Sequence, residues 1–233
     1  MRRVAGISGA PIAQAMPDLA ERLLFLVPLI LSLSVHEWAH ARTAYALGDD
    51  TASLLGRCTI DPLAHIDLMG TIVLPLLGVP FGWAKPVPVN PLRFDHRYSM
   101  TGGMMLTALA GPLSNVALAA LSALLFAVAV RSSPFGEDLS GPIQVGLLFM
   151  VQVNVALAIF NLIPVPPLDG SRVANHFMPL SLRPLWIRIQ MAGPLALLVL
   201  LLFLNVFGGV LASAIGWGRD FLLGLFGVHL RAF

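Results

Sequence analysis

The chain of 233 residues is 57% hydrophobic and only 11% charged, whereas soluble domains carry about 25% charged residues. Its net charge of +2 comes from scattered arginines and one lysine without a basic run, which excludes a nucleic-acid-binding protein. Cys58 is the only cysteine, so no intrachain disulfide and no cysteine-based metal site can form. This composition predicts a single-domain, multi-pass membrane protein over residues 1–233, with the lipid bilayer around it.

Four apolar stretches are long enough to cross a bilayer, which takes about 20 residues. They cover residues 19–47, 104–130, 142–163 and 191–215. Residues 1–18 are predicted to form a polar leader, because glycine and proline interrupt any apolar core of a signal peptide. Residues 70–83 and 221–230 are apolar but too short to span, and we expect them to be re-entrant or interfacial. The pattern predicts an all-α polytopic membrane protein with about four transmembrane helices.

The region between the first two spans contains two segments whose sequences are typical of short strands. Residues 51–60 and 83–91 are rich in β-branched residues or punctuated by proline, which predicts a small membrane-associated β region. Pro86, Pro88 and Pro91 lack an N–H group and exclude a helix for the second segment. This segment is therefore expected to be an edge strand or an extended arm. A plain extended loop is an equal alternative.

The first span carries the sequence His36-Glu37-Trp38-Ala39-His40 in its second half. Residues four apart lie on one face of a helix, so His36 and His40 can offer two imidazoles to one zinc ion. Glu37 would then flank the open coordination position and handle the proton of a water molecule. The alternative is a pair of buried histidines that hydrogen-bond to other helices, but ionisable groups inside membrane segments are costly and usually functional.

A catalytic zinc site usually has three protein ligands and one open position, so a third ligand must come from elsewhere. If the four spans alternate in direction, the end of the third span lies on the same side as the two histidines. Asp169 follows that end in the sequence NLIPVPPLDG (residues 161–170), where prolines break the helix. Irregular backbone at membrane depth is tolerated only beside protein or a water-filled cavity. The alternative role for Asp169 is the N-cap of a helix starting near Gly170. The remaining histidines, for which turn or surface roles are expected, are His65, His96, His176 and His229.

Three motifs in this order resemble the site-2 protease family of intramembrane zinc metalloproteases. They are HEWAH in the first span, AGPLSN at residues 110–115, and NLIPVPPLDG at residues 161–170. GWAKPVPVNP (residues 82–91) and DPLAHIDLMGT (residues 61–71) further resemble the compact bacterial and archaeal branch, which has no PDZ or CBS domain. The resemblance covers nearly the whole chain.

The resemblance implies roles for individual residues. His36, His40 and Asp169 would bind one zinc ion per chain, and Glu37 would be the catalytic acid and base. Asn115 and Asn161 would be polar groups near the site that contact substrate, with hydrogen bonding between helices as their alternative role.

The implied function is hydrolysis of a peptide bond within or next to a transmembrane segment of a membrane protein, as in regulated intramembrane proteolysis. Such a substrate must unwind, and the exposed backbone groups need new partners. The segment Pro86-Val87-Pro88-Val89 could supply them by pairing with the substrate as an added strand. More Lys and Arg residues lie on the catalytic side of the predicted topology, which favours a cytoplasmic active site in a bacterial or archaeal inner membrane.

Two other functions compete with this one. A protease that trims prenylated proteins also has an HExxH motif near a membrane, but resembles a pattern with a later Glu as third ligand. The only later Glu here is Glu137, in a loop predicted on the opposite side. A non-catalytic metal-binding protein or metal transporter would be expected to show acidic or polar residues in several spans, and the later spans are nearly free of them.

Overall fold

A computed structural model of the chain describes residues 3–4, 19–77, 82–132 and 141–230. Most of these residues are helical, and the four longest helices overlap the four apolar stretches predicted from the sequence. They are α1 (Leu19–Ala46), α4 (Met100–Arg131), α5 (Pro142–Asn161) and α8 (Gly193–Leu225). By length and composition, α4 and α5 could each cross a membrane. Most of the predicted polar leader lies outside the described residues.

Shorter elements connect these helices. In chain order they are α2 (Thr51–Leu54), a 3-10 turn (Pro62–Ala64), a wide helical turn (Leu68–Val73), α3 (Leu74–Leu76), a second 3-10 turn (Pro91–Arg93), α6 (Asp169–Phe177) and α7 (Arg183–Met191). The predicted short segment at 70–83 therefore begins as helical turns. The segment at 221–230 differs from the prediction, because its first residues continue α8 and only its end leaves the helix.

The predicted β region between the first two spans is wrong for residues 51–60. Residues 51–54 form a helix because the buried carboxylate of Asp49 accepts hydrogen bonds from the backbone N–H and the hydroxyl of Thr51, which starts a helical turn. The only strands among the described residues are β1 (Arg3–Val4) and β2 (His229–Leu230), which pair in parallel. Residues 83–90 are extended without a partner strand in the described part of the chain. The proline argument against a helix there is confirmed.

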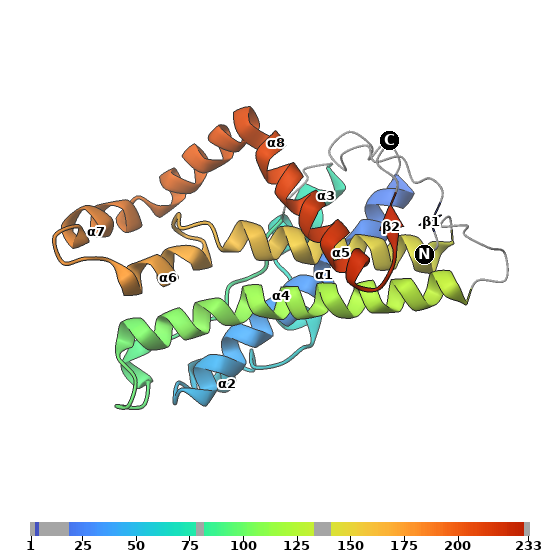
Figure 1. Cartoon of the computed structure of the whole chain (residues 1–233). Coiled ribbons are helices and arrows are strands. Elements are labelled where there is room, and N and C mark those ends of the chain that lie inside the picture. Colours follow the sequence, from blue (N-terminus) through green and yellow to red (C-terminus); the bar gives the residue numbers. More distant parts are fainter. Residues whose placement is uncertain (1–2, 5–18, 78–81, 133–140, 231–233) are drawn as a thin grey trace.

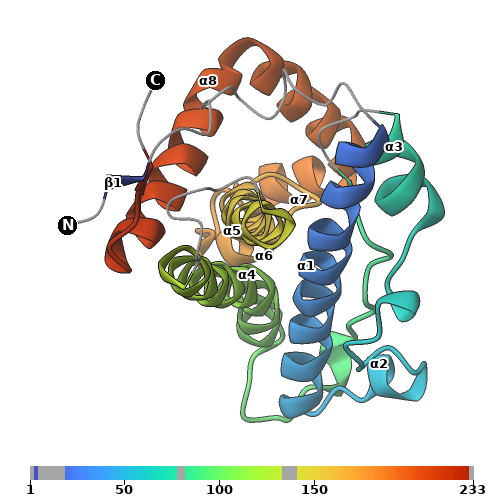
Figure 2. The same cartoon turned by 90° about the vertical axis from the view of Figure 1, so that its right-hand side faces the viewer.

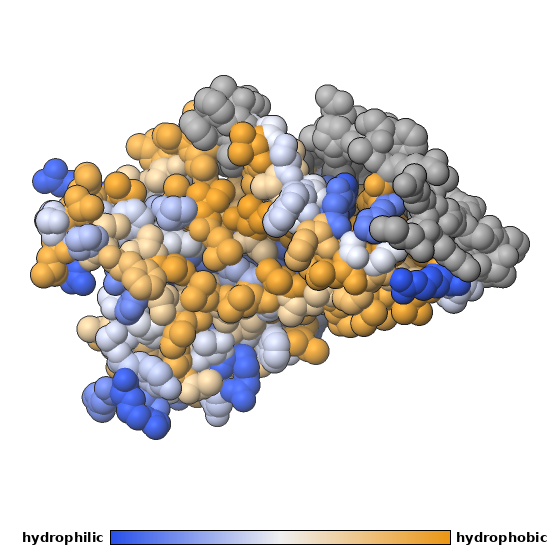
Figure 3. Space-filling model, viewed as in Figure 1, coloured by the Kyte–Doolittle hydropathy of each residue, from blue (hydrophilic) through white to orange (hydrophobic). Residues whose placement is uncertain are grey.

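The long helices form one bundle with an apolar outer surface. Helices α4 and α5 lie side by side, with α1 against them on one flank and α8 curving past the other (Figures 1 and 2). Their core contains Phe126, Val151 and Leu223, packed over alanines of α4 that let the helices approach closely. In the most apolar 18 residues of each helix, only 33% of α4 and 28% of α5 are buried. Most of this apolar surface therefore does not pack inside the bundle. Hydrophobic side chains cover the middle of the molecule in Figure 3, as lipid contact requires.

The arrangement of the bundle brings three helix ends together. The end of α1, the beginning of α4 and the end of α5 lie at one end of the molecule, together with α6 (Figure 1). Two buried histidines of α1 therefore meet the loop that follows α5. The extended segment of residues 83–90 passes the same place, since it lines a cavity with these histidines.

Candidate metal centre

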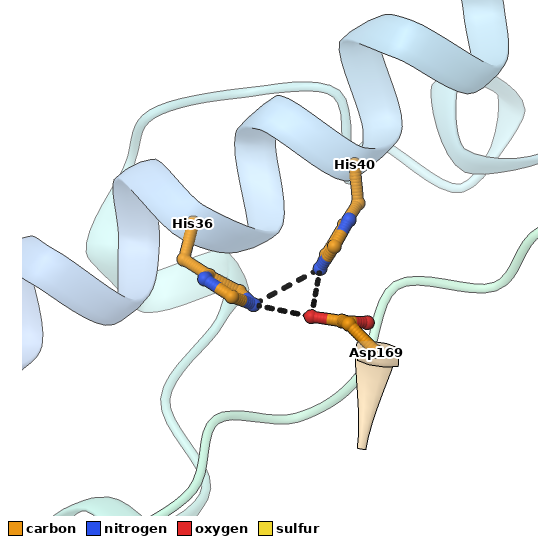
Figure 4. Close-up of side chains that lie close together, drawn as sticks. All are labelled: His36, His40 and Asp169. Carbon is orange, nitrogen blue, oxygen red and sulfur yellow. Dashed lines mark hydrogen bonds and ion pairs between the residues drawn. The ribbon is translucent and has the colours of Figure 1, made fainter. Parts of the chain in front are cut away.

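His36, His40 and Asp169 converge on one point (Figure 4). The two Nε2 atoms of the histidines lie 3.0 Å apart, and each lies 3.2 Å from Oδ2 of Asp169. All three residues are buried. The histidines share one face of α1, one turn apart, while the aspartate is the first residue of α6.

The spacing of these three atoms fits a zinc ion. Ligand atoms about 2.0–2.1 Å from a tetrahedral zinc ion lie about 3.3 Å from one another. The observed separations of 3.0 Å and 3.2 Å are close to that value. Three protein ligands leave a fourth position open, as catalytic zinc sites require. Within the described residues, His36, His40 and Asp169 form the only such group, so none of the other four histidines joins it.

The hydrogen bonds of the two Nδ1 atoms determine which ring nitrogens face the centre. His40 Nδ1 lies 2.7 Å from the backbone oxygen of Thr107, which can only accept, so this nitrogen carries the proton. His36 Nδ1 lies 2.6 Å from Oδ1 of Asn115, also an acceptor. Both Nε2 atoms therefore present lone pairs toward the carboxylate of Asp169. Three such groups at this spacing repel one another unless a positive charge lies between them, and a metal cation satisfies all three.

Asp169 is held in place by the loop before α6. The residue before it, Leu168, is the N-cap of α6, and no side chain caps this helix end. The alternative reading of Asp169 as an N-cap is therefore wrong.

Glycine at two positions lets backbone and rings come this close. A Cβ atom at Gly111 of α4 would lie 2.5 Å from the ring of His40 and 2.6 Å from that of His36. A Cβ atom at Gly170 would lie 2.2 Å from the backbone oxygen of Leu162. Any larger residue would displace the histidines in the first case and the loop carrying Asp169 in the second.

A cavity of about 350 Å³ adjoins the three candidate ligands. Glu37 lines it, and its Oε2 accepts a hydrogen bond of 2.8 Å from the backbone N–H of Val87. The extended segment of residues 83–90 forms one wall through Pro86, Val87 and Val89, whereas Pro88 is not part of the lining. The cavity gives a peptide and a water molecule room beside the centre.

The two predicted asparagines have different positions. Asn161 lines the cavity, and its Nδ2 donates to the backbone oxygen of Leu157 at 3.0 Å. Asn115 is completely buried behind His36 and does not line the cavity, so its position suits support of a ligand rather than contact with substrate.

Several residues at the centre were not singled out from the sequence. Thr107 and Gly111 of α4 hold or approach the histidine rings, and Arg172 of α6 lines the cavity. His65, expected at a surface or turn, is buried, with its Nε2 2.8 Å from the backbone oxygen of Thr59. Gly111 is part of the motif AGPLSN (residues 110–115), and this motif was the sequence signal for it.

A helical protein with apolar outer faces and a buried His, His and Asp centre beside a cavity has the features of a membrane metallohydrolase. The family model described as peptidase family M50 matches residues 136–204, which include Asp169. The protein named "Putative zinc metalloprotease YwhC" from Bacillus subtilis (strain 168) is 38% identical over 206 residues, covering 86% of this chain and 90% of that protein. "Putative zinc metalloprotease Rip2" from Mycobacterium tuberculosis (strain ATCC 25618 / H37Rv) is 28% identical over 218 residues, covering 93% and 79%.

The chain belongs to peptidase family M50, the site-2 protease family of membrane-embedded metalloproteases. This assignment confirms the resemblance seen in the sequence motifs. No solved structure matches the chain.

Proposed function

We propose that this protein is an intramembrane zinc metalloprotease that hydrolyses a peptide bond within or next to a transmembrane segment of a membrane protein, as in regulated intramembrane proteolysis. The observation that carries the proposal is the convergence of two imidazole lone pairs and a carboxylate within 3.2 Å of one another, in a bundle with apolar outer faces. A buried cluster of this kind at membrane depth is costly unless it serves a function.

In this proposal His36, His40 and Asp169 hold one zinc ion per chain. When bound there, zinc would polarise the scissile carbonyl and bring the pKa of a water molecule to about 7. The protein's part is to hold three ligand atoms in a buried site and to leave the cavity side open. The relatives named as zinc metalloproteases support zinc as the metal.

Glu37 is the proposed general base and acid. It lines the cavity next to the three ligands, so its carboxylate can take a proton from the attacking water and pass it to the leaving nitrogen. The Val87 N–H group, 2.8 Å from Glu37 Oε2, holds the carboxylate at the cavity wall. The same carboxylate thus serves the proposed proton transfer and contacts the extended segment.

The extended segment Pro86-Val87-Pro88-Val89 is the proposed binding site for the unwound substrate. Pro86 and Pro88 have no N–H group, and the Val87 N–H group is already bonded to Glu37. Among the described residues, no partner binds the carbonyl of Val87 or the N–H group of Val89. These two groups lie on one edge of an extended chain, where a substrate strand can pair with both.

This substrate site can be tested by disulfide crosslinking. A cysteine at Val89, in a Cys58→Ser and Glu37→Gln protein, is expected to crosslink to single cysteines flanking the cleavage site of a model membrane substrate. Crosslinks that follow the substrate sequence in register support strand pairing. A protein that crosslinks the substrate from Asn161 but at no position from Val89 would contradict it.

Arg172 is a further candidate in this mechanism. It lies three residues after Asp169 on α6 and lines the cavity. Within the described part of the chain, its guanidinium makes no hydrogen bond or ion pair. A cation beside the metal centre would stabilise the negative charge that develops on the carbonyl oxygen during attack.

The membrane placement completes the proposal. Helices α1, α4, α5 and α8 would cross the bilayer, with the metal centre at the end that faces the cytoplasm of a bacterial or archaeal cell. Substrate and lipid would be the partners of a single domain spanning residues 1–233. The apolar middle of the surface supports this placement.

The central test combines zinc analysis and cleavage. Purified wild-type protein in detergent or vesicles is expected to carry one zinc ion per chain and to cleave a model membrane substrate. Glu37→Gln is expected to keep zinc and lose cleavage, because the amide has the shape of the carboxylate but not its basicity. His36→Ala is expected to lose both. Cleavage near the wild-type rate by Glu37→Gln, or full zinc occupancy in His36→Ala, would contradict the proposal.

A further inference from the structure

A second polar cluster lies behind the metal centre, in the middle of three apolar helices. Ser32 of α1, Asn115 of α4 and Asn154 of α5 are all completely buried. Asn115 Nδ2 donates to Asn154 Oδ1 at 2.8 Å, and Asn154 Nδ2 donates to Ser32 Oγ at 2.8 Å. None of these side chains lines the cavity, so they act on the centre only through His36.

The direction of every hydrogen bond in this cluster can be worked out from its ends. Asn154 Nδ2 also lies 2.8 Å from the backbone oxygen of Met150, which only accepts, so this end of the amide is the NH₂ group. Oδ1 of Asn154 must then face Asn115, whose NH₂ group donates to it and lies 3.4 Å from the backbone oxygen of Ser32. Oδ1 of Asn115 is therefore left to accept from His36 Nδ1, 2.6 Å away.

The orientation of one amide thus determines the next. A reversed Asn115 would place its NH₂ group against His36, which would favour the other tautomer and put a proton on Nε2, the atom that faces His40 and Asp169. Nothing in Asn115 itself prevents this reversal, because its oxygen and its nitrogen have nearly the same shape. Asn154 Oδ1, 2.8 Å away, is the nearer of two acceptors that make the reversed form unfavourable, since two amide oxygens would then face each other, and the backbone oxygen of Ser32 at 3.4 Å is the second.

We propose that Asn154, oriented by the carbonyl of Met150 and by Ser32, is a positioning residue that fixes the amide of Asn115 and thereby keeps the Nε2 lone pair of His36 directed at the metal. The inference rests on the proposed zinc site. It gives α5, which contributes no metal ligand within its helical residues, a role in metal binding.

The helix α1 supplies a matched pair of variants for the test. Ser32 and Ser34 are both buried, and each hydroxyl donates to the carbonyl four residues earlier, at 2.6 Å to Pro28 and 2.7 Å to Ile30. Only Ser32 also accepts a hydrogen bond from Asn154. Ser32→Ala and Ser34→Ala therefore remove the same group from the same helix, and they differ in whether the cluster behind His36 is affected.

Zinc affinity is measured by competition with a fluorescent chelator, on wild-type protein and on Asn154→Leu, Ser32→Ala and Ser34→Ala. Partners of metal ligands typically contribute about 10–100-fold in affinity. We expect a loss of about tenfold for Asn154→Leu, near the lower end of that range because it acts through Asn115. Ser32→Ala should show a smaller loss, and Ser34→Ala no change.

A spectroscopic measurement separates positioning from general loosening of the bundle. In zinc-loaded protein with ¹⁵N-labelled histidine, the Nδ1–H signal of His36, identified by its through-space contact with the side chain of Asn115, reports the hydrogen bond to Asn115. We expect this proton to exchange faster with solvent in Asn154→Leu and Ser32→Ala, and the His40 signal to stay unchanged, because Thr107 is not part of the cluster.

The outcomes are distinguishable from failure of the zinc site itself. If zinc affinity depends on His36 but is the same in wild type, Asn154→Leu and Ser32→Ala, the positioning role is wrong and the zinc site stands. If Asn154→Leu does not fold, Ser32→Ala decides: wild-type affinity and an unchanged His36 signal would overturn the inference. Equal losses in Ser32→Ala and Ser34→Ala would also overturn it, because only one of them touches Asn154.

Discussion

Replacing Gly111 by alanine is the sharpest single change for testing the metal centre, because one methyl group would meet both histidine rings. The added Cβ atom would lie 2.5 Å from Cε1 and Nε2 of His40 and 2.6 Å from Cε1 of His36. Carbon atoms in ordinary contact are about 3.5–4.0 Å apart. The rings or helix α4 must therefore shift by about 1 Å, whereas metal-ligand distances are held within about 0.2 Å.

The expected result is a loss of zinc affinity of about 100-fold in Gly111→Ala, at the upper end of the range of about 10–100-fold for changes next to metal ligands, because both rings must move. Helix formation should not suffer, because alanine is favoured over glycine inside a helix by about 1 kcal/mol. Gly146→Ala is the matched control, because a Cβ atom at Gly146 of α5 meets nothing within 4 Å.

The assay is zinc content after dialysis against a chelator, with size-exclusion chromatography and circular dichroism in detergent to show that the fold is intact. Gly146→Ala should keep one zinc ion per chain, and Gly111→Ala should lose it. A folded Gly111→Ala protein with wild-type zinc affinity would refute the assignment of these two rings to one metal ion.

Two further predictions concern the cavity and its wall. Arg172→Leu should lower kcat about 100-fold with zinc content unchanged, and Arg172→Lys should recover part of the loss, because both Arg and Lys place a cation beside the carbonyl oxygen. Equal kcat in wild type, Arg172→Leu and Arg172→Lys would exclude this role. Asp49→Asn should lower the free energy of unfolding by about 1–3 kcal/mol. One oxygen of the buried carboxylate accepts from Thr51 and the other from the Asn90 N–H group, whereas an amide has only one oxygen that can accept. Unfolding in denaturant measures this change, and an unaltered midpoint with unaltered slope would contradict it.

The convergence of the three candidate ligands was predictable, because the sequence pattern around each of them is local. Two histidines four residues apart share a helix face whatever surrounds them, and the span carrying them needed only to be a helix. Asp169 was predictable from topology, since helices that alternate in direction bring the end of the third span back to the same level. The prolines before it indicated where regular helix ends, and α5 does end at Asn161.

The supporting residues could not be predicted, because their signals look the same in any membrane bundle. An asparagine in an apolar helix indicates a hydrogen bond to some other helix, but the sequence does not say which helix or which face. Asn154 illustrates this, since its position beside Asn115 depends on how α4 and α5 pack against each other. Gly111 lies in the motif AGPLSN, but the sequence does not show that its missing side chain makes room for the two histidine rings.

The strand prediction for residues 51–60 failed because a local hydrogen bond outweighed β propensity. Thr51 is β-branched and favours a strand on average, but the carboxylate of Asp49 binds both its N–H and its hydroxyl and turns the chain. The same carboxylate accepts from the N–H group of Asn90, at the end of the extended segment. One buried side chain thus starts a short helix and anchors the far end of the cavity wall.

The prolines of the extended segment do not by themselves determine which of its two edges faces the metal centre. Pro86 and Pro88 remove every N–H donor from one edge, so the donors of Lys85, Val87 and Val89 all lie on the other edge. The Lys85 N–H binds the backbone oxygen of His65, and the Val87 N–H binds Glu37. At Val87 the donating edge therefore faces the helix bearing the histidines, and among the described residues the next donor along it without a partner is that of Val89. In the proposed binding mode, a substrate strand paired there would lie between the segment and the metal centre, where hydrolysis requires it to be.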